Sequence, residues 1–187
     1  TLTAMEPPAR FEADAVRDEK VKVLRALAPL RREQVSERTV RAQYAAGAVA
    51  GGAVPGYREE PGVNPRSTTE TFLAAKLEVD NWRWAGVPFY LRTGKRLAKR
   101  ATEITIVFRH PPYALFRSAG CASLEANVLR LRIQPDEGIS LSFGSKSPGQ
   151  SLHIDPVRMD FNYLTSFGAD PPEAYEHRSI GVELDEH

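Results

Sequence analysis

The spacing of hydrophobic and polar residues changes along the chain and predicts a helical region followed by strands. Near the N-terminus, apolar residues recur at helical intervals: Val16, Val23, Leu24 and Leu27. This spacing predicts a helix over residues 14–30, with Asp14 as its N-cap and Pro29 at its end. Residues 31–44 fit two structures equally well, a second helix or a strand that begins near Thr39.

The second part of the chain has the pattern of a sheet. Residues 45–67 are rich in Gly and Pro, which predicts a long loop. Beyond them, six segments alternate apolar with polar residues or form short apolar runs: 73–79, 87–91, 104–108, 129–133, 139–143 and 159–163. The turn at residues 135–138 connects two of these segments as a hairpin. We therefore expect an α+β fold, a large and mainly antiparallel β-sheet with helices on one face.

Composition narrows the class of protein. The chain has 187 residues, a formal net charge of +1 and 42% hydrophobic residues, which is typical of a globular domain. Near-neutral charge argues against a dedicated nucleic-acid-binding protein, and no apolar run has the length of a membrane span. Cys121 is the only cysteine, so neither an intrachain disulfide nor a cysteine metal site can form. A reducing, cytoplasmic location is the natural expectation.

The clearest candidate for chemistry is a local cluster of positive charge. Five basic residues and no acidic residue occur between positions 92 and 100: Arg92, Lys95, Arg96, Lys99 and Arg100. A basic loop at the end of an apolar strand is suited to holding an anion, most simply a phosphate. We expect Gly94 to let the backbone turn sharply, so that Lys95 and Arg100 together hold a dianionic phosphate. From these residues alone, a solvated basic loop is an equally good interpretation.

The sequence contains neither of two common nucleotide-binding motifs, the P-loop and the dinucleotide fingerprint. The pair Gly94-Lys95 lacks the spacing of a P-loop, because Phe89 stands where a glycine is needed and Arg96 where Ser or Thr is needed. The glycines of residues 47–56 do not have the spacing of a dinucleotide fingerprint. The chain therefore shows no nucleotide-binding fold of its own.

Other polar and aromatic residues are weaker candidates. The four histidines, which share no metal-ligand spacing and are expected to be structural or solvated, are His110, His153, His177 and His187. Trp82 and Trp84 would share one face of a strand as core or interface aromatics, with sugar stacking as the weaker alternative. Gln134 ends an apolar strand, where its amide would bind a sugar hydroxyl or cap the turn.

Several motifs in the same order resemble glucose-6-phosphate dehydrogenases. The motif Trp-Arg-Trp-Ala-Gly-Val-Pro-Phe-Tyr-Leu-Arg-Thr-Gly-Lys at residues 82–95 carries most of the resemblance. It is supported by Val-Arg-Asp-Glu-Lys-Val-Lys-Val-Leu at 16–24, Ser-Thr-Thr-Glu-Thr-Phe at 67–72 and Arg-Ile-Gln-Pro-Asp-Glu at 132–137. The ordered matches extend over residues 14–176, almost the whole chain.

The resemblance implies both an activity and a set of binding residues. Members of the family oxidise glucose 6-phosphate to the lactone, the first step of the oxidative pentose phosphate pathway, with NADP or in some members NAD. It implies a C-terminal domain whose antiparallel sheet forms a homodimer interface. Lys95, Arg100 and Gln134 match positions that contact the substrate. Arg92 and Arg132 match positions that bind a second, structural NADP in some members.

The resemblance also implies what lies elsewhere. The family's Rossmann domain and its catalytic histidine lie upstream of the matched segment, so no catalytic residue is assigned here. We expect the chain alone to be inactive, with residues 1–176 as the substrate-contacting and dimerisation domain. Residues 177–187 depart from the family pattern and are expected to form a poorly ordered tail. The alternatives are a catalytically inactive dimerisation or interaction module and, less favoured, nonspecific anion or nucleic-acid binding by the basic loop.

Overall fold

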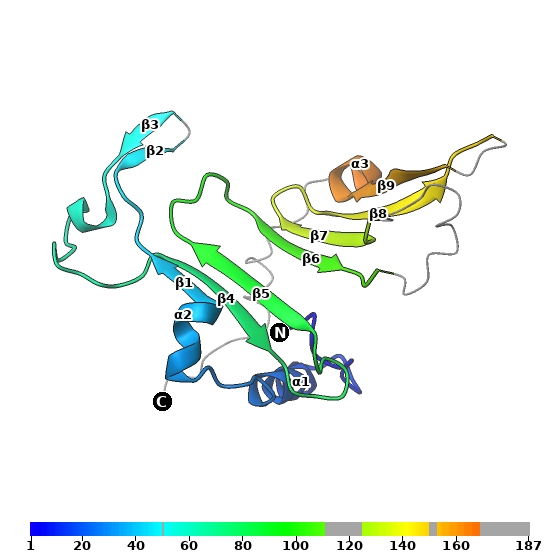
Figure 1. Cartoon of the computed structure of the whole chain (residues 1–187), viewed down its shortest axis with the longest axis horizontal. Coiled ribbons are helices and arrows are strands. Elements are labelled where there is room, and N and C mark those ends of the chain that lie inside the picture. Colours follow the sequence, from blue (N-terminus) through cyan, green and yellow to red (C-terminus); the bar gives the residue numbers. More distant parts are fainter. Residues whose placement is uncertain (50, 111–124, 150–152, 169–187) are drawn as a thin grey trace. The chain divides into compact units, whose positions relative to one another are not determined.

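The computed structural model describes residues 1–49, 51–110, 125–149 and 153–168 of the chain. They belong to two compact units, Thr1–Ala98 and Lys99–His187 (Figure 1). Each unit contains an antiparallel sheet.

The first unit begins with helix α1, Ala13–Arg25. Its N-cap is Glu12, which makes no side-chain capping bond. The expectation that Asp14 is the N-cap was therefore wrong. The helix begins at Ala13, one residue before the predicted start. The Asp14 carboxylate lies within its first turn and accepts a hydrogen bond of 3.0 Å from Arg17. Val23 faces inward and is only 5% exposed. This single buried position anchors the helix to the unit.

A small apolar cluster lies beneath α1. Val23 packs with Ala4 and with Val79, which follows strand β4, Phe72–Glu78, and Trp84 packs against this cluster. The Trp84 indole N–H donates to the carbonyl of Ala4 at 2.9 Å, so its polar atom is satisfied. Trp84 lies in a turn and not on a strand, and Trp82 in the same turn is fully exposed. The expectation that both tryptophans share a strand face was therefore wrong.

The ambiguous segment after α1 contains both structures that its sequence allowed. A 3₁₀ turn η1, Arg32–Gln34, and a short helix α2, Val35–Arg38, lead into strand β1, Thr39–Ala42. The Thr39 hydroxyl donates to the carbonyl of Val35 at 2.7 Å, which closes the helical turn as the strand begins. The strand starts at the predicted residue.

Strand β1 joins β4, Phe72–Glu78, and β5, Pro88–Gly94, in an antiparallel sheet with the order β1-β4-β5 (Figure 1). The segment between β1 and β4 was predicted as a loop without strands. It contains the hairpin β2, Gly47–Val49, and β3, Gly52–Val54, followed by a 3₁₀ turn η2, Tyr57–Glu59. Gly51 takes the left-handed conformation that the hairpin turn needs, with φ 82°. Strands this short carry too few residues for alternation to reveal them.

The second unit contains a four-stranded antiparallel sheet with the order β6-β7-β8-β9. Its strands are β6, Thr102–Val107, β7, Val128–Gln134, β8, Gly138–Lys146, and β9, Ile154–Asn162. The predicted hairpin between β7 and β8 is confirmed, with Asp136 in its turn at φ 57°. Helix α3, Tyr163–Phe167, follows β9, and Asn162 caps it by accepting a 3.0 Å bond from the Thr165 N–H.

The register of this sheet separates its two faces. One face carries two apolar rows: Ile104, Leu131, Ile139 and Phe161, then Ile106, Leu129, Leu141 and Met159. The rows between them belong to the other face and are mainly polar: Glu103, Arg132, Gly138 and Asn162, then Thr105, Arg130, Ser140 and Asp160. The mainly antiparallel α+β class is confirmed, with the strands of the described residues divided among three sheets. None of the described helices has the length and apolar character needed to cross a bilayer.

Candidate functional site

Strand β5 brings Lys95 to one face of the three-stranded sheet. Arg41 on β1, Leu73 on β4 and Thr93 on β5 lie opposite one another in the register. Because side chains two residues apart share a face, Lys95 follows Thr93 on that face and lies beside Thr71. The backbone N–H of Lys95 donates to the Thr71 carbonyl at 2.8 Å, which fixes the chain just beyond the strand.

The same face is hollowed. The cavity has a volume of about 480 Å³, and its polar lining is Arg41, Glu70, Thr71, Thr93 and Lys95. This volume lies within the usual range for small-molecule sites. Arg41 Nη1 donates to Glu70 Oε1 at 2.7 Å. The hollow thus combines an ammonium group, a guanidinium–carboxylate pair and two hydroxyl groups, which are the groups that bind phosphates and sugars.

A second hollow borders the same ion pair and is less suited to a ligand. It measures about 610 Å³ and includes Arg32, Gln43 and Arg58 in its lining. Arg58 Nε donates to Gln43 Oε1 at 2.9 Å, and the Gln43 amide donates to two loop carbonyls. The Gln43 amide and the Arg58 guanidinium of this hollow are therefore already bound to the protein. The hollow beside Lys95 is the better candidate.

The basic cluster consists of cations with different surroundings. The Arg92 guanidinium lies over the Phe72 ring, 5.8 Å from its centre. Arg96 binds the Glu60 carboxylate and lies over the Tyr44 ring at 5.4 Å. Interaction with Tyr44, and then with Glu60, raises the pKa of Arg96 above its ordinary value. Arg96 is thus a charged structural cation.

Lys95 differs from its neighbour. It is exposed, and among the described residues no carboxylate lies within ion-pair distance of its ammonium group. An exposed lysine without a partner retains its full capacity to bind an anion. Of the adjacent pair Lys95 and Arg96, only the lysine is available to a ligand.

Gly94 has a role other than the expected one. Its φ is not in the left-handed region, and the residue with positive φ in this loop is Arg96, at 49°. A Cβ at Gly94 would lie 3.0 Å from a ring carbon of Phe72 and 3.3 Å from the Thr71 carbonyl oxygen. Glycine is needed here because β4 packs closely against this position, and the sharp turn itself is made two residues later.

The two other predicted substrate residues belong to the second unit. Arg100 is exposed and meets no acidic partner in the part of the chain that the structure describes. Gln134 is half-buried at the end of β7, opposite Thr102 on β6. Its side-chain amide makes no hydrogen bond with any described residue, so a turn-capping role for it is not observed. Both side chains are free to bind a ligand within their own unit.

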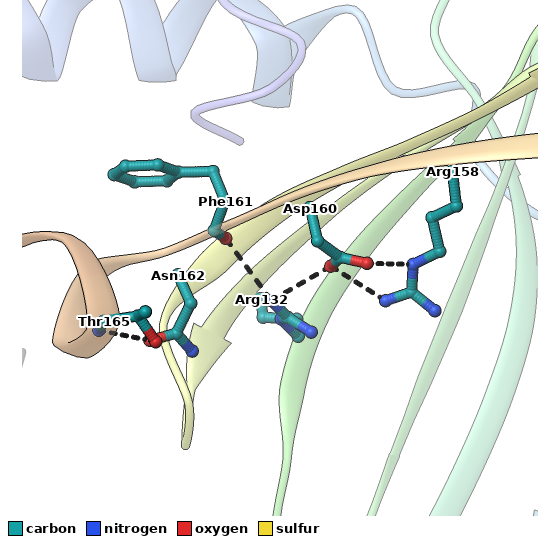
Figure 2. Close-up of polar contacts among 6 residues, drawn as sticks. All are labelled: Arg132, Arg158, Asp160, Phe161, Asn162 and Thr165. Atoms are coloured by element: carbon teal, nitrogen blue, oxygen red, sulfur yellow. Dashed lines mark hydrogen bonds and ion pairs between the residues drawn. The ribbon is translucent and has the colours of Figure 1, made fainter.

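Arg132, by contrast, is held by the protein (Figure 2). Its Nη2 lies 3.5 Å from Asp160 Oδ1 and donates to the Phe161 carbonyl at 3.4 Å. Asp160 is shared with Arg158, whose Nη2 donates to the same oxygen at 2.9 Å. The Arg132 Nε is buried without a hydrogen-bond partner among the described residues. Gly138 makes room for this guanidinium, because a Cβ there would collide with it.

The histidines that the structure describes do not form a metal site. No group of three or more His, Cys, Asp or Glu side chains within the described ranges is arranged to hold a metal ion. His153 Nε2 lies 3.0 Å from the Asp155 carboxylate at an exposed strand end, which agrees with a surface role. His177 and His187 lie outside the described residues, as does the predicted tail at residues 177–187.

Sequence reasoning missed Arg41 and Glu70. They are 29 residues apart in the chain and meet only because β1 pairs with β4. Their opposite charges on either side of the Gly- and Pro-rich segment were the available signal. It could be used only once residues 39–42 were known to form a strand beside β4.

Comparisons with known proteins give a consistent result. The family model described as "Glucose-6-phosphate dehydrogenase, C-terminal domain" matches residues 1–179. A glucose-6-phosphate 1-dehydrogenase of Chlamydia muridarum is 48% identical over 177 residues, which cover 94% of this chain and 34% of the relative. Glucose-6-phosphate 1-dehydrogenase 2 of Mycobacterium tuberculosis is 50% identical over 185 residues, which cover 99% of this chain and 36% of the relative.

Solved structures agree with the sequence matches. A glucose-6-phosphate dehydrogenase in complex with its substrate glucose-6-phosphate is similar with a TM-score of 0.77 and 35% identity, over 94% of this chain and 34% of that one. A glucose-6-phosphate 1-dehydrogenase from Mycobacterium avium is similar with a TM-score of 0.71 and 36% identity, over the same shares of the two chains. This chain therefore spans about a third of the length of the relatives it matches.

Proposed function

Because the chain belongs to the glucose-6-phosphate dehydrogenase C-terminal domain family, we propose that it is the sugar-phosphate-contacting part of a cytoplasmic glucose-6-phosphate dehydrogenase. The whole protein would oxidise glucose 6-phosphate to 6-phosphogluconolactone with NADP, the first step of the oxidative pentose phosphate pathway. Relatives that extend well beyond this chain bear that name, and one solved relative holds glucose 6-phosphate.

The proposal rests mainly on the surroundings of the Lys95 side chain. Its ammonium group meets no carboxylate of the described residues and lines a hollow with two hydroxyl groups. A cation that the protein leaves unpaired beside such a hollow is suited to the phosphate or a hydroxyl group of a sugar phosphate. Arg96, the next residue, cannot do the same because Glu60 already neutralises it.

Arg100 and Gln134, which belong to the second unit, are the other proposed substrate contacts. Neither side chain is bound to another described residue, so each retains its donors for a ligand. Within that unit, the Arg100 guanidinium is suited to binding a phosphate, and the Gln134 amide supplies a donor and an acceptor for sugar hydroxyls.

The described residues do not fit a site for the coenzyme. A dinucleotide site needs a glycine-rich turn between a strand and a helix, with the pyrophosphate at the helix N-terminus. The Gly-rich segment of this chain instead forms the β2–β3 hairpin and a 3₁₀ turn. We assign no coenzyme contact in the reaction to this chain, and we expect the purified chain alone not to produce NADPH.

Arg92 and Arg132 are weaker proposals for a structural nucleotide. Arg92 keeps its guanidinium over Phe72, where its N–H groups remain able to bind a phosphate. Arg132 would first have to exchange its contact with Asp160 for the nucleotide. Of the two, Arg92 has the smaller rearrangement to make.

We also propose that the protein forms a homodimer through the apolar face of the β6–β9 sheet. Met159 and Ile139 on that face are 60% and 40% exposed, which is unusual for large apolar side chains in neighbouring rows. A second copy of the same face would cover them. Met159→Lys should shift the chain toward the monomer in light scattering, whereas Val107→Lys, at an exposed apolar residue on the opposite face, should not.

The direct test is a calorimetric titration of the purified chain with glucose 6-phosphate. Glucose and inorganic phosphate serve as control ligands, and Lys95→Ala as the variant. Saturable binding that exceeds that of both controls and is lost in Lys95→Ala supports the proposal. Equal binding of glucose 6-phosphate and inorganic phosphate contradicts a sugar-phosphate site in this chain.

A further inference from the structure

The hollow beside Lys95 contains one acidic side chain, and its position is informative. Glu70 lies in the loop before β4 and lines the hollow together with Lys95, Thr71 and Thr93. A carboxylate beside an anion-binding lysine should weaken binding of a phosphate by repulsion. The carboxylate of Glu70 must therefore be neutralised by a partner, or it must itself bind part of the ligand.

Arg41 is the neutralising partner. Its Nη1 donates to Glu70 Oε1 at 2.7 Å, and the two side chains are 58% and 41% exposed. The pair removes most of the net charge of the carboxylate, so that a phosphate held by Lys95 does not meet an unbalanced negative charge. Arg41 reaches the hollow from β1, where the register places it opposite Leu73.

The ligand-binding role of Glu70 follows from its other oxygen. Only Oε1 is bound by Arg41, and Oε2 accepts no hydrogen bond from any described residue. An ionised carboxylate accepts hydrogen bonds and donates none, so its natural ligand partner is a hydroxyl group. Carbon-bound hydroxyl groups are what a sugar phosphate has and a simple phosphate lacks.

We propose that Glu70 is a specificity-determining residue of the Lys95 hollow, and that Arg41 is the residue that positions it. Glu70 Oε2 accepts a hydrogen bond from a hydroxyl group of the sugar while Lys95 binds the anionic part of the same ligand. Thr71 and Thr93 provide further hydroxyl groups on the same face. This inference rests on the proposed function, since it names how the same site separates a sugar phosphate from other phosphates.

The proposal has a quantitative consequence. Removing the carboxylate deletes an acceptor for the sugar and leaves the binding of the phosphate unchanged or stronger. A hydrogen bond to a charged group in a half-exposed site contributes enough that its loss lowers affinity roughly tenfold. The ratio of the affinities for glucose 6-phosphate and for ethyl phosphate, a phosphate monoester without sugar hydroxyls, should fall by that factor.

The experiment is a titration of the wild-type chain and its variants with these two ligands. Glu70→Ala should lower the affinity ratio roughly tenfold, through weaker binding of glucose 6-phosphate only. The matched control is Glu78→Ala on β4, which breaks the similar Arg38–Glu78 ion pair, where Glu78 is 38% exposed, but does not line the hollow. This control should keep the wild-type ratio.

Two further variants test the role of Arg41 and protect against a loss of folding. Arg41→Met should reduce the ratio, and Arg41→Lys should restore most of it, because a lysine still neutralises Glu70. A purely structural role for Arg41 would change both affinities together and leave the ratio intact. Glu70→Gln keeps the size of the side chain and should give an intermediate ratio.

The outcomes separate this inference from the proposed function. If Glu70→Ala keeps the wild-type ratio while Lys95→Ala loses both ligands, Glu70 has no part in specificity, and the Lys95 site stands. If the wild-type chain binds both ligands equally, or neither, then this inference fails together with the sugar-phosphate site assigned to the chain.

Discussion

Lys95 and Arg132 are cations at comparable places, each near the end of a strand at the edge of a turn, but their surroundings are opposite. The Lys95 ammonium meets no acidic group of the described residues and lines a hollow. The Arg132 guanidinium is held by Asp160 and by the Phe161 carbonyl, with its Nε buried (Figure 2). Charge in the sequence is therefore a poor guide to binding unless the partners of each cation are known.

The difference has a physical origin. Arg132 lies in a row with Gly138 and Asn162 and next to the row that contains Asp160, so that the sheet itself supplies acceptors. Lys95 lies just beyond the end of β5, where the neighbouring strand provides the Thr71 carbonyl to its backbone and no acceptor to its side chain. Strand β9 thus satisfies the Arg132 side chain, whereas Lys95, past the end of its strand, remains available.

The largest expected effect is that of Lys95→Ala. It removes the one cation of the hollow that has no carboxylate partner among the described residues, and we expect glucose 6-phosphate to bind at least roughly ten times more weakly. Calorimetry measures the affinity, and the free energy of unfolding should stay near the wild-type value because the side chain is exposed. Lys99→Ala, at another exposed lysine of the basic cluster, is the control and should retain most of the binding. Equal losses in both variants would indicate a diffuse basic loop.

Gly94→Ala should have the next largest effect. The new methyl group would press on Phe72 and on the Thr71 carbonyl, which lie 3.0 Å and 3.3 Å from the added carbon. Overpacking of this kind costs about 1.5 kcal/mol of stability. The shift should also displace Lys95 and weaken ligand binding several-fold. Urea unfolding and calorimetry check the two effects. Unchanged stability would mean that β4 and Phe72 move aside freely.

Asp160→Asn should free the Arg132 guanidinium from its ion pair. The substitution removes the charge that holds Arg132 and Arg158, and because the group is partly exposed we expect a loss of only about 1 kcal/mol in unfolding free energy. The freed guanidinium groups should then bind inorganic phosphate more tightly than the wild-type chain does. Urea unfolding and phosphate titration measure both changes. No gain in phosphate binding would show that Asp160 is not what keeps Arg132 from ligands.

The smallest expected effect is that of Glu60→Gln. It weakens the ion pair of Arg96, so the melting temperature should fall less than in Asp160→Asn, since Arg96 also stays over the Tyr44 ring. Binding of glucose 6-phosphate should not weaken, and it should tighten slightly because Arg96 is then no longer neutralised. A strong loss of binding here would move the functional cation from Lys95 to Arg96.

Local patterns were enough to predict much of the fold. The existence of the first helix and of the strands from residue 72 onward follows from periodicity, which is a property of neighbouring residues. The helix was predicted over residues 14–30 and instead ends at Arg25. The β2–β3 hairpin was missed because each of its strands has only three residues, flanked by glycines. The cap at Glu12 was missed because it makes no side-chain bond that would favour a capping residue.

The candidate site could be predicted only in part, because its state depends on distant partners. Lys95 and Arg96 are adjacent and carry the same charge, and the difference between them comes from Glu60, 36 residues from Arg96 in the chain. Arg41 and Glu70 likewise meet through strand pairing. The family motif makes Lys95 a candidate, and whether its side chain is available to a ligand is a tertiary property.

The most direct test of the contrast between the two cations is an NMR titration of the isotopically labelled chain with glucose 6-phosphate. We predict that the side-chain signals of Lys95 and the amide signals of Thr71 and Thr93 shift in a saturable way, while the Nε–H signal of Arg132 stays in place. A shift at Arg132 with Lys95 unchanged would contradict the account and place the anion on the β6–β9 sheet instead.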